Sequence, residues 1–362
     1  MEKTRLLNLG KEIRKAGIGG VLICPSEELL FLSGFTPMIC ERFQGLFVTA
    51  KDEYFYICNL LYQGEIKQAY KDEIPIFTWK DGESMTAVVA ELMEDYQLKN
   101  KAIAVNSSAQ AFNILDIARD CGVTFINGLR LLEEARIIKT EEEKDNLRQS
   151  AKIVDEVFKQ ALVFLHPGQS EAEVSAFLQA KMVEAGGTKP WSIAASGPNS
   201  SYPHYTGDQR IIEEQDILIM DFGCVYNGMY SDTTRTVFFG DITDKQREIY
   251  QYVLAANKAG EAAAVNGAYI PDVDSAARSI IEKAGYGADF ITRLGHGIGY
   301  MIHEAPDIKK NNERSLQAGM AFSIEPGIYL SGDFGVRIED IVLVSEDGNE
   351  ILNKSSKEII IL

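Results

Sequence analysis

Two aspartates in one short stretch are the first residues whose spacing suggests chemistry. Asp221 ends the apolar run 217–220, and Asp232 follows in the same stretch, "MDFGCVYNGMYSDTTRT". The Asn-Gly pair at 227–228 lies between them, and this pair is the strongest two-residue signal for a β-hairpin. We therefore predict a hairpin that brings the two carboxylates back to the same neighbourhood.

That turn fixes the register of the two strands. It pairs Asp221 with Thr234 and Gly223 with Asp232, and we expect Gly223 to leave open space beside Asp232. Because side chains alternate between the faces of a strand, both carboxylates fall on one face as diagonal neighbours, with Cα atoms about 7–8 Å apart. Two such charges repel and lose hydration unless a cation or a proton compensates. The alternative from the hairpin alone is that Asp232 caps the turn or pairs with Arg235.

A second region places acidic residues in strand-like sequence. Glu325 ends the apolar run 321–324, and Glu339 interrupts the strand-like run 335–344, "GVRIEDIVLV". Side-chain alternation puts Arg337 and Glu339 on one face of that strand. Each glutamate singly is explained by a surface or salt-bridged position, but acidic residues in apolar strands are uncommon. Together with the aspartates they predict a cation site.

The four histidines are the other candidates for chemistry. His296 lies between glycines and His303 follows seven positions later, in "LGHGIGYMIHEAP", while His204 lies in the Gly-, Pro- and Ser-rich loop "SGPNSSYPH". His166 ends a helical pattern and is most simply a cap. A lone histidine is usually structural, so these residues gain meaning only from the carboxylates nearby.

The elements that must position these residues fall into two parts. Residues 1–130 alternate helical and short strand patterns, including a hairpin around 51–53, and predict an α/β domain. Residues 131–362 open with a strongly helical stretch to about 165 and continue as helices and antiparallel hairpins, which predict an α+β domain. All four histidines lie in the second part.

Composition excludes several classes of function. The 362 residues carry a net charge of -17, with 53 acidic and 36 basic residues and no Lys/Arg-rich block, which disfavours a nucleic-acid or anionic-membrane surface. We find neither a secretory signal nor an apolar run near the ~20 residues of a membrane span. The five cysteines are dispersed, as expected of reduced thiols in a cytoplasmic protein.

The motifs together resemble a known family. "SGPNSSYPH", "MDFGCVYNGMYSDTTRT", "LGHGIGYMIHEAP", "FSIEPGIY" and "GVRIED" follow one another in the order typical of the pita-bread metallopeptidases. Within that family the chain is similar to the Xaa-Pro branch, which contains prolidase (Xaa-Pro dipeptidase) and aminopeptidase P. The resemblance covers nearly the whole chain. It implies a creatinase-like N-terminal α/β domain, a pita-bread catalytic domain and a homodimer.

The resemblance also assigns the site. It implies two divalent metal ions, whose charge would balance four carboxylates, and these ligands: Asp221, Asp232, His296, Glu325 and Glu339. Mn²⁺ or Co²⁺ suits such an oxygen-rich site better than Zn²⁺, which remains an option. Glu325 would also shuttle a proton, His204 and His303 would face the substrate, and Arg337 would orient the ligands.

The substrate is expected to be a small peptide with proline in second position. Asp307 stands where some prolidases carry an arginine that clamps the dipeptide's carboxylate, and an aspartate facing the pocket would repel that group. The short N-terminal domain nevertheless favours a dipeptidase, with an aminopeptidase P acting on longer peptides as the alternative.

Three further classes fit less well. A metal-free creatinase-like hydrolase or an inactive peptide-binding module would not need all five ligands, and a methionine aminopeptidase would not be expected to carry this N-terminal domain.

Overall fold

The computed structural model describes residues 3–71 and 73–362, which form two compact units, Met1–Arg136 and Ile137–Leu362. The sequence predicted a division at residue 130, and the structure divides the chain between Arg136 and Ile137. The predicted classes are confirmed, because the first unit is α/β and the second is α+β.

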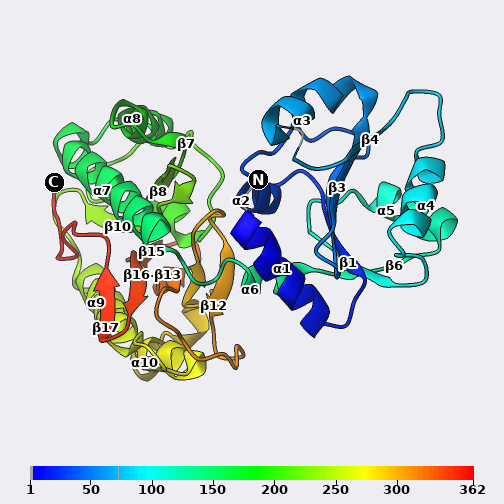
Figure 1. Ribbon diagram of the computed structural model, residues 1–362. Coiled ribbons are helices and arrows are strands. Elements are labelled where there is room, and N and C mark those ends of the chain that lie inside the picture. The colour runs from blue at the N-terminus through cyan, green and yellow to red at the C-terminus, as the bar shows by residue number, and fades with distance from the viewer. Residues whose placement is uncertain (1–2, 72) are drawn as a thin grey trace. The chain divides into compact units, whose positions relative to one another are not determined.

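The first unit is built on a mixed six-stranded sheet in the order β4-β3-β2-β1-β5-β6 (Figure 1). Its strands are β1 (Gly20–Ile23), β2 (Gly45–Thr49), β3 (Tyr54–Asn59), β4 (Ile76–Trp79), β5 (Ala102–Val105) and β6 (Thr124–Asn127). The pairs β1–β2 and β2–β3 are antiparallel and the other three pairs are parallel. The predicted hairpin around residues 51–53 is the β2–β3 pair.

Helices accompany this sheet. They are α1 (Lys3–Lys15), α2 (Glu27–Ser33), α3 (Gln63–Tyr70), α4 (Met85–Asp95), α5 (Ala111–Cys121) and α6 (Leu129–Glu134), with a 3₁₀ turn η1 (Leu60–Tyr62). The core on the sheet mixes aliphatic and aromatic side chains, and the rings of Phe47 and Phe55 stack there at 4.8 Å between centroids.

The second unit contains three sheets. Four strands form the order β10-β8-β7 with β9 beside β8, five form β12-β11-β13-β16-β17, and β14 pairs with β15. Their bounds are β7 (Thr188–Ser196), β8 (Ile217–Tyr226), β9 (Met229–Tyr230), β10 (Thr233–Phe238), β11 (Gly295–Gly297), β12 (Glu304–Ile308), β13 (Ala321–Ile324), β14 (Gly327–Leu330), β15 (Phe334–Arg337), β16 (Asp340–Ser345) and β17 (Gly348–Ile351).

The helices of this unit are α7 (Glu141–Phe164), α8 (Glu171–Glu184), α9 (Asp244–Ala263) and α10 (Ile270–Lys283), with 3₁₀ turns η2 (Gly197–Ser201) and η3 (Gly287–Asp289). Helices α7 and α8 lie on one side of the strands and α9 and α10 on the other (Figure 1). The helical stretch predicted from 131 to 165 is interrupted, because α6 ends at Glu134 and α7 starts afresh at Glu141. Thr140 causes the new start, since its hydroxyl accepts from the backbone N–H of Glu143 while the Glu143 carboxylate accepts from the N–H of Thr140.

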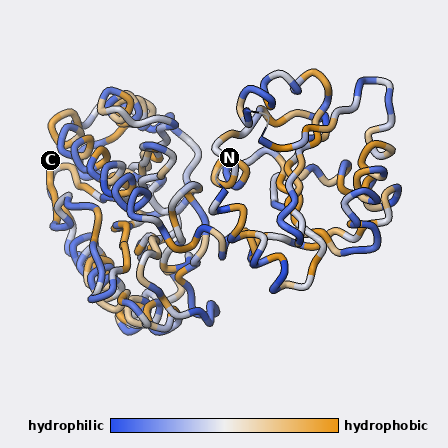
Figure 2. Tube along the Cα trace, viewed as in Figure 1, coloured by the Kyte–Doolittle hydropathy of each residue, from blue (hydrophilic) through white to orange (hydrophobic). Residues whose placement is uncertain are grey.

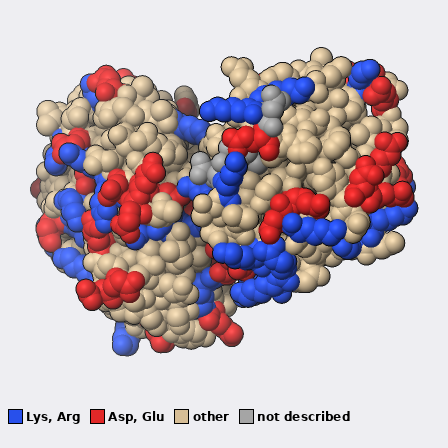
Figure 3. Space-filling view, in the orientation of Figure 1, with Lys and Arg blue, Asp and Glu red and all other residues tan. Residues whose placement is uncertain are grey.

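Hydrophilic and hydrophobic residues are mixed along the helices of both units (Figure 2). Acidic and basic side chains are interspersed on the face of the second unit shown in Figure 3. Among residues 3–71 and 73–362, no helix has the length and apolar character that crossing a membrane requires.

Candidate metal centre

The five predicted ligands all lie in the second unit, either within a strand or directly beside one. Asp221 lies within β8, Asp232 in the break between β9 and β10, and His296 within β11. Glu325 directly follows β13, and Glu339 lies between β15 and β16. These five residues are called the acidic cluster below.

The predicted hairpin register is confirmed for Asp221, whereas the predicted pair of Gly223 with Asp232 does not form because Asp232 lies in the break between β9 and β10. Asp221 pairs with Thr234 across β8 and β10, as the Asn-Gly turn requires. The open space expected beside Asp232 is not there, because a Cβ added at Gly223 would lie 2.0 Å from the Ser231 carbonyl oxygen. Gly223 therefore serves a close approach of the backbone rather than an empty site. The alternative partner for Asp232 is also excluded, since Arg235 instead binds Asp340 at 2.6 Å.

The continuous strand predicted over 335–344 is wrong. It splits into β15 and β16, which belong to different sheets, at Ile338 and Glu339. The break occurs because the backbone of Glu339 turns to β10, where its N–H donates to the Thr234 carbonyl oxygen at 3.1 Å. This turn carries the Glu339 side chain toward the hairpin that holds the two aspartates.

The side chains of the cluster meet at short distances. His296 Nε2 lies 3.2 Å from Glu325 Oε1 and 3.5 Å from Asp232 Oδ2. Asp232, His296 and Glu339 each offer one ligand atom, and these three atoms lie within 4.8 Å of one another. The structure thus brings together residues that are up to 107 positions apart in the chain.

Three buried oxygens of the cluster have no hydrogen-bond partner among the described residues. They are Oδ1 of Asp221, Oδ1 of Asp232 and Oε1 of Glu339. A buried carboxylate oxygen without a donor is costly, and a bound ion is one way in which native structures compensate for it. Carboxylate oxygens with one imidazole are a suitable donor set for divalent ions. The residues present therefore fit the metal pair implied by the resemblance.

Electrostatics supports the same interpretation. Burial raises the pKa of Asp232 well above its usual value, and the neighbouring charges of Glu339, Asp221 and Glu325 raise it further. Burial likewise raises the pKa of Glu339 well above its ordinary range and that of Glu325 to about 7. Burial lowers the pKa of His296 to about 4. The cluster therefore resists ionisation without a cation and presents a neutral imidazole.

Arg337 is built into the wall of the cluster. Its Nη2 donates to Asp221 Oδ2 at 2.6 Å, its Nε to Thr234 Oγ1 at 2.9 Å and its Nη1 to Tyr329 Oη at 2.9 Å. Thr234 Oγ1 in turn donates to Glu339 Oε2 at 2.7 Å. Arg337 and Thr234 together fix one oxygen of Asp221 and one of Glu339.

Sequence reasoning did not single out Thr234 and Tyr329. The signal for Thr234 was present in the hairpin register, which sets it opposite Asp221. Tyr329 stands four residues after Glu325, but nothing in the sequence indicates that its hydroxyl reaches a residue on another strand.

The two remaining predicted histidines lie near the cluster with exposed side chains. The ring of His303 is 4.3 Å from that of His296 between centroids, at an interplanar angle of 79°. Loss of solvent around the ring, together with the nearby His296, lowers the pKa of His303 to about 4, which keeps it neutral near pH 7. His204 belongs to a loop anchored beside the cluster, because Arg337 Nη1 donates to the Pro203 carbonyl oxygen at 3.2 Å.

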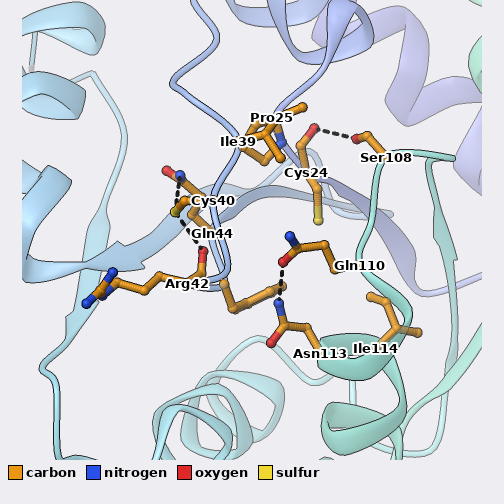
Figure 4. Close-up of a pocket in the computed structure, with 11 residues that line it drawn as sticks. Cys24, Pro25, Ile39, Cys40, Arg42, Gln44, Ser108, Gln110, Asn113 and Ile114 are labelled. Carbon is orange, nitrogen blue, oxygen red and sulfur yellow. Dashed lines mark hydrogen bonds between the residues drawn. The ribbon is translucent and has the colours of Figure 1, made fainter.

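The first unit holds a separate pocket, shown in Figure 4. Its polar groups are engaged with the protein itself. Gln110 and Asn113 bind each other at 3.0 Å, and Arg42 forms two hydrogen bonds, of 3.0 and 2.9 Å, with Asp81. This pocket does not gather the charged, uncompensated groups found in the acidic cluster.

Family models match both parts of the chain. "Metallopeptidase family M24" matches residues 145–346, and "Creatinase/Prolidase N-terminal domain" matches residues 5–138. The chain belongs to metallopeptidase family M24. It is thus a metal-dependent hydrolase with the pita-bread fold that the motifs indicated.

Proteins of similar length and structure support this placement. A probable dipeptidase PepE from Mycobacterium tuberculosis is 34% identical over 351 residues, which cover 96% of this chain and 93% of the relative. A prolidase from Thermococcus sibiricus has a TM-score of 0.94 at 30% identity and covers 100% and 99% of the two chains. An X-Pro aminopeptidase from Thermotoga maritima has a TM-score of 0.84 at 29% identity, with 99% of each chain covered.

Proposed function

We propose that this metallopeptidase cleaves the Xaa-Pro peptide bond and that its main substrates are Xaa-Pro dipeptides. The observation that carries the proposal is the acidic cluster, in which three buried carboxylate oxygens lack a protein partner. Membership of family M24 and similarity to a prolidase over nearly the whole chain support the substrate class.

The cluster would hold two divalent ions through Asp221, Asp232, His296, Glu325 and Glu339. We propose Mn²⁺ or Co²⁺, with Zn²⁺ as a further option, because oxygen donors outnumber the single imidazole. When bound, a metal pair polarises the scissile carbonyl and supplies a nucleophile at neutral pH. The charges of four carboxylates and two divalent ions would cancel, which is compatible with a buried site.

The chain's own residues perform the remaining work. Glu325 is held by its neighbours, because its Oε1 accepts from Ser323 Oγ at 3.0 Å and its N–H donates to the Leu294 carbonyl oxygen at 2.8 Å. From this position its carboxylate takes a proton from the attacking water and returns it to the proline nitrogen as that nitrogen leaves. Arg337 keeps Asp221 in place through the 2.6 Å contact.

The exposed histidines would contact the substrate. His303 is neutral near pH 7 and can donate a hydrogen bond to the carbonyl oxygen as negative charge develops there. His204 lies in a loop beside the same cluster and would contact the proline side of the substrate. A donor placed at a developing oxyanion typically lowers the activation free energy by about 2.7–4 kcal/mol.

The second candidate is an aminopeptidase acting on longer peptides, which the similarity to the Thermotoga maritima X-Pro aminopeptidase supports. Retention of all five ligands disfavours a metal-free creatinase-like hydrolase or an inactive binding module. We further propose a homodimer, supported by the family resemblance, and a cytoplasmic location, supported by the dispersed cysteines.

A substrate panel tests the proposal. The protein, loaded with Mn²⁺ or Co²⁺, is assayed on Xaa-Pro dipeptides, on the matching Xaa-Pro-Yaa tripeptides and on dipeptides without proline. We expect the highest kcat/KM for the Xaa-Pro dipeptides. Faster cleavage of the tripeptides would move the assignment to the aminopeptidase, and no cleavage of any Xaa-Pro bond would reject both.

A further inference from the structure

Asp307 occupies the position where sequence reasoning expected a repelling charge. It lies in β12, four residues after His303, and both of its carboxylate oxygens are bound by cations. Arg293 Nη1 donates to Oδ1 at 2.6 Å, and Lys309 Nζ donates to Oδ2 at 2.6 Å. The three side chains together carry a net positive charge, so the expected repulsion is removed.

Arg293 lies close to the proposed chemistry along the chain and in space. It precedes Leu294, whose carbonyl oxygen accepts from the Glu325 N–H at 2.8 Å, and it stands three residues before His296. Its guanidinium binds Asp307, which lies on β12 four residues after His303, and β12 pairs with β11, the strand that carries His296. The Arg293–Asp307 pair therefore lies on the strand beside the one that holds His296.

The guanidinium of Arg293 also has N–H donors that form no hydrogen bond with the described residues. Among the described residues, Nη1 has a hydrogen-bond partner whereas Nε and Nη2 have none, and the side chain is 34% exposed. Arg337 differs in both respects, because all three of its side-chain nitrogens donate to protein oxygens and the side chain is 3% exposed. A guanidinium with two adjacent free donors matches the two oxygens of a carboxylate.

We propose that Arg293 binds the C-terminal carboxylate of the substrate and that Asp307 positions it. The inference rests on the proposed function and sharpens it. A dipeptide presents its proline carboxylate at this place, whereas a longer peptide presents a neutral amide. Arg293 is thus the residue that selects dipeptides, in place of an arginine at position 307.

The test removes the guanidinium and compares charged with neutral substrates. Arg293→Met is assayed beside the wild type on an Xaa-Pro dipeptide and on the same dipeptide with a C-terminal amide. We expect kcat/KM for the dipeptide to fall about 10- to 100-fold, mainly through KM, because a charge-assisted hydrogen bond is lost. The value for the amide should change little, and Arg293→Lys should restore part of the preference.

Arg148→Met is the matched control. Arg148 is 37% exposed and also pairs with a carboxylate, that of Glu350, but it lies on α7 and has no contact with the acidic cluster among the described residues. This variant should keep the wild-type ratio of dipeptide to amide. Metal content and circular dichroism are measured for each variant, so that loss of metal or of fold is recognised.

The outcomes separate the two claims. If the wild type cleaves Xaa-Pro dipeptides but Arg293→Met lowers dipeptide and amide hydrolysis equally, or neither, the role of Arg293 is rejected while the proposed function stands. If the metal-loaded wild type cleaves neither substrate, the proposed function itself fails.

Discussion

Two groups of buried charges in the second unit differ in how they are compensated. The acidic cluster lies on one side of the contact between β10 and the start of β16. On the other side lies what we call the paired cluster, formed by Arg235, Glu261, Asp340 and Lys357. Residues adjacent in sequence contribute to different groups. Thr234 and Glu339 contact each other at the acidic cluster. The residues that follow them in the chain, Arg235 and Asp340, contact each other in the paired cluster.

The paired cluster is complete within the chain. Asp340 lies 2.6 Å from Arg235 Nη2 and 2.8 Å from Lys357 Nζ, and Lys357 also binds Glu261 at 2.7 Å. Two carboxylates therefore face two cations. The acidic cluster has four carboxylates. Among the described residues, Arg337 is the arginine or lysine that forms an ion pair with one of them, Asp221.

This difference identifies the functional group better than acidity does. Buried carboxylates are common to both clusters, and a buried ion pair by itself says little about function. What distinguishes the acidic cluster is that three of its buried carboxylate oxygens lack a hydrogen-bond partner among the described residues, whereas the one such oxygen of the paired cluster, Asp340 Oδ2, lies 2.8 Å from Lys357 Nζ. Metal ions would do for this cluster what Arg235 and Lys357 do for the other.

Removing metal should give the largest effect. We expect chelation to lower activity on an Xaa-Pro dipeptide by at least about 10³-fold, because several kcal/mol of transition-state stabilisation is lost, and Mn²⁺ or Co²⁺ to restore it. The free energy of unfolding should rise by about 2.7 kcal/mol per ion at a metal concentration 100 times Kd. Full activity in protein shown to be metal-free would contradict the claim that metal ions compensate the carboxylates of the acidic cluster.

The same Asp-to-Asn change should act in opposite directions in the two clusters. Asp340→Asn leaves the buried Arg235 without its carboxylate partner and leaves Lys357 with Glu261 alone, and should lower the free energy of unfolding by about 3 kcal/mol. Chemical denaturation of the metal-free proteins measures the effect.

Asp232→Asn is the matched partner of that variant. In metal-free protein it removes one of several repelling charges, so we expect an unfolding free energy equal to or above that of the wild type. If both variants lost the same unfolding free energy, Asp232 would have a stabilising partner within the protein. The two clusters would then not differ in how their charges are compensated.

Glu325→Gln should separate ligation from proton transfer within the acidic cluster. The amide keeps one oxygen donor and the size of the side chain but cannot take a proton, so kcat should fall by at least about 10²-fold. Metal content is measured in the same samples. A variant with its metals and a kcat near that of the wild type would rule out the shuttle role.

Local pattern predicted the parts of the site that depend on one hairpin. The Asn-Gly turn and strand alternation were enough to pair Asp221 with Thr234, and the structure confirms that register. Strand patterns on either side of residues 51–53 were likewise enough to predict the β2–β3 hairpin. These features depend on residues close in sequence, whose geometry the backbone itself determines.

Features that depend on distant contacts were missed. The break before β16 occurs because Glu339 pairs with Thr234, about a hundred residues earlier, and no local signal marks it. Asp307 was judged by its own charge, whereas its effect depends on Arg293 and Lys309 beside it. The predicted roles of the ligands, of His204 and of His303 stay predictions.

The smallest expected effect concerns Glu261 in the paired cluster. Burial and the charge of Asp340 raise the pKa of Glu261 from 4.5 to about 7 despite its contact with Lys357. Between these pH values the unfolded chain has lost the proton that the folded protein keeps, so the contribution of Glu261 to stability is full below about pH 4.5 and declines as pH rises to 7. Glu261→Gln cannot titrate. The unfolding free energy of the variant minus that of the wild type should therefore increase from pH 4.5 to 7 and then level off. A difference that is flat, or that decreases with pH, would mean that Lys357 holds Glu261 ionised throughout and that the paired cluster is compensated more fully than its burial suggests.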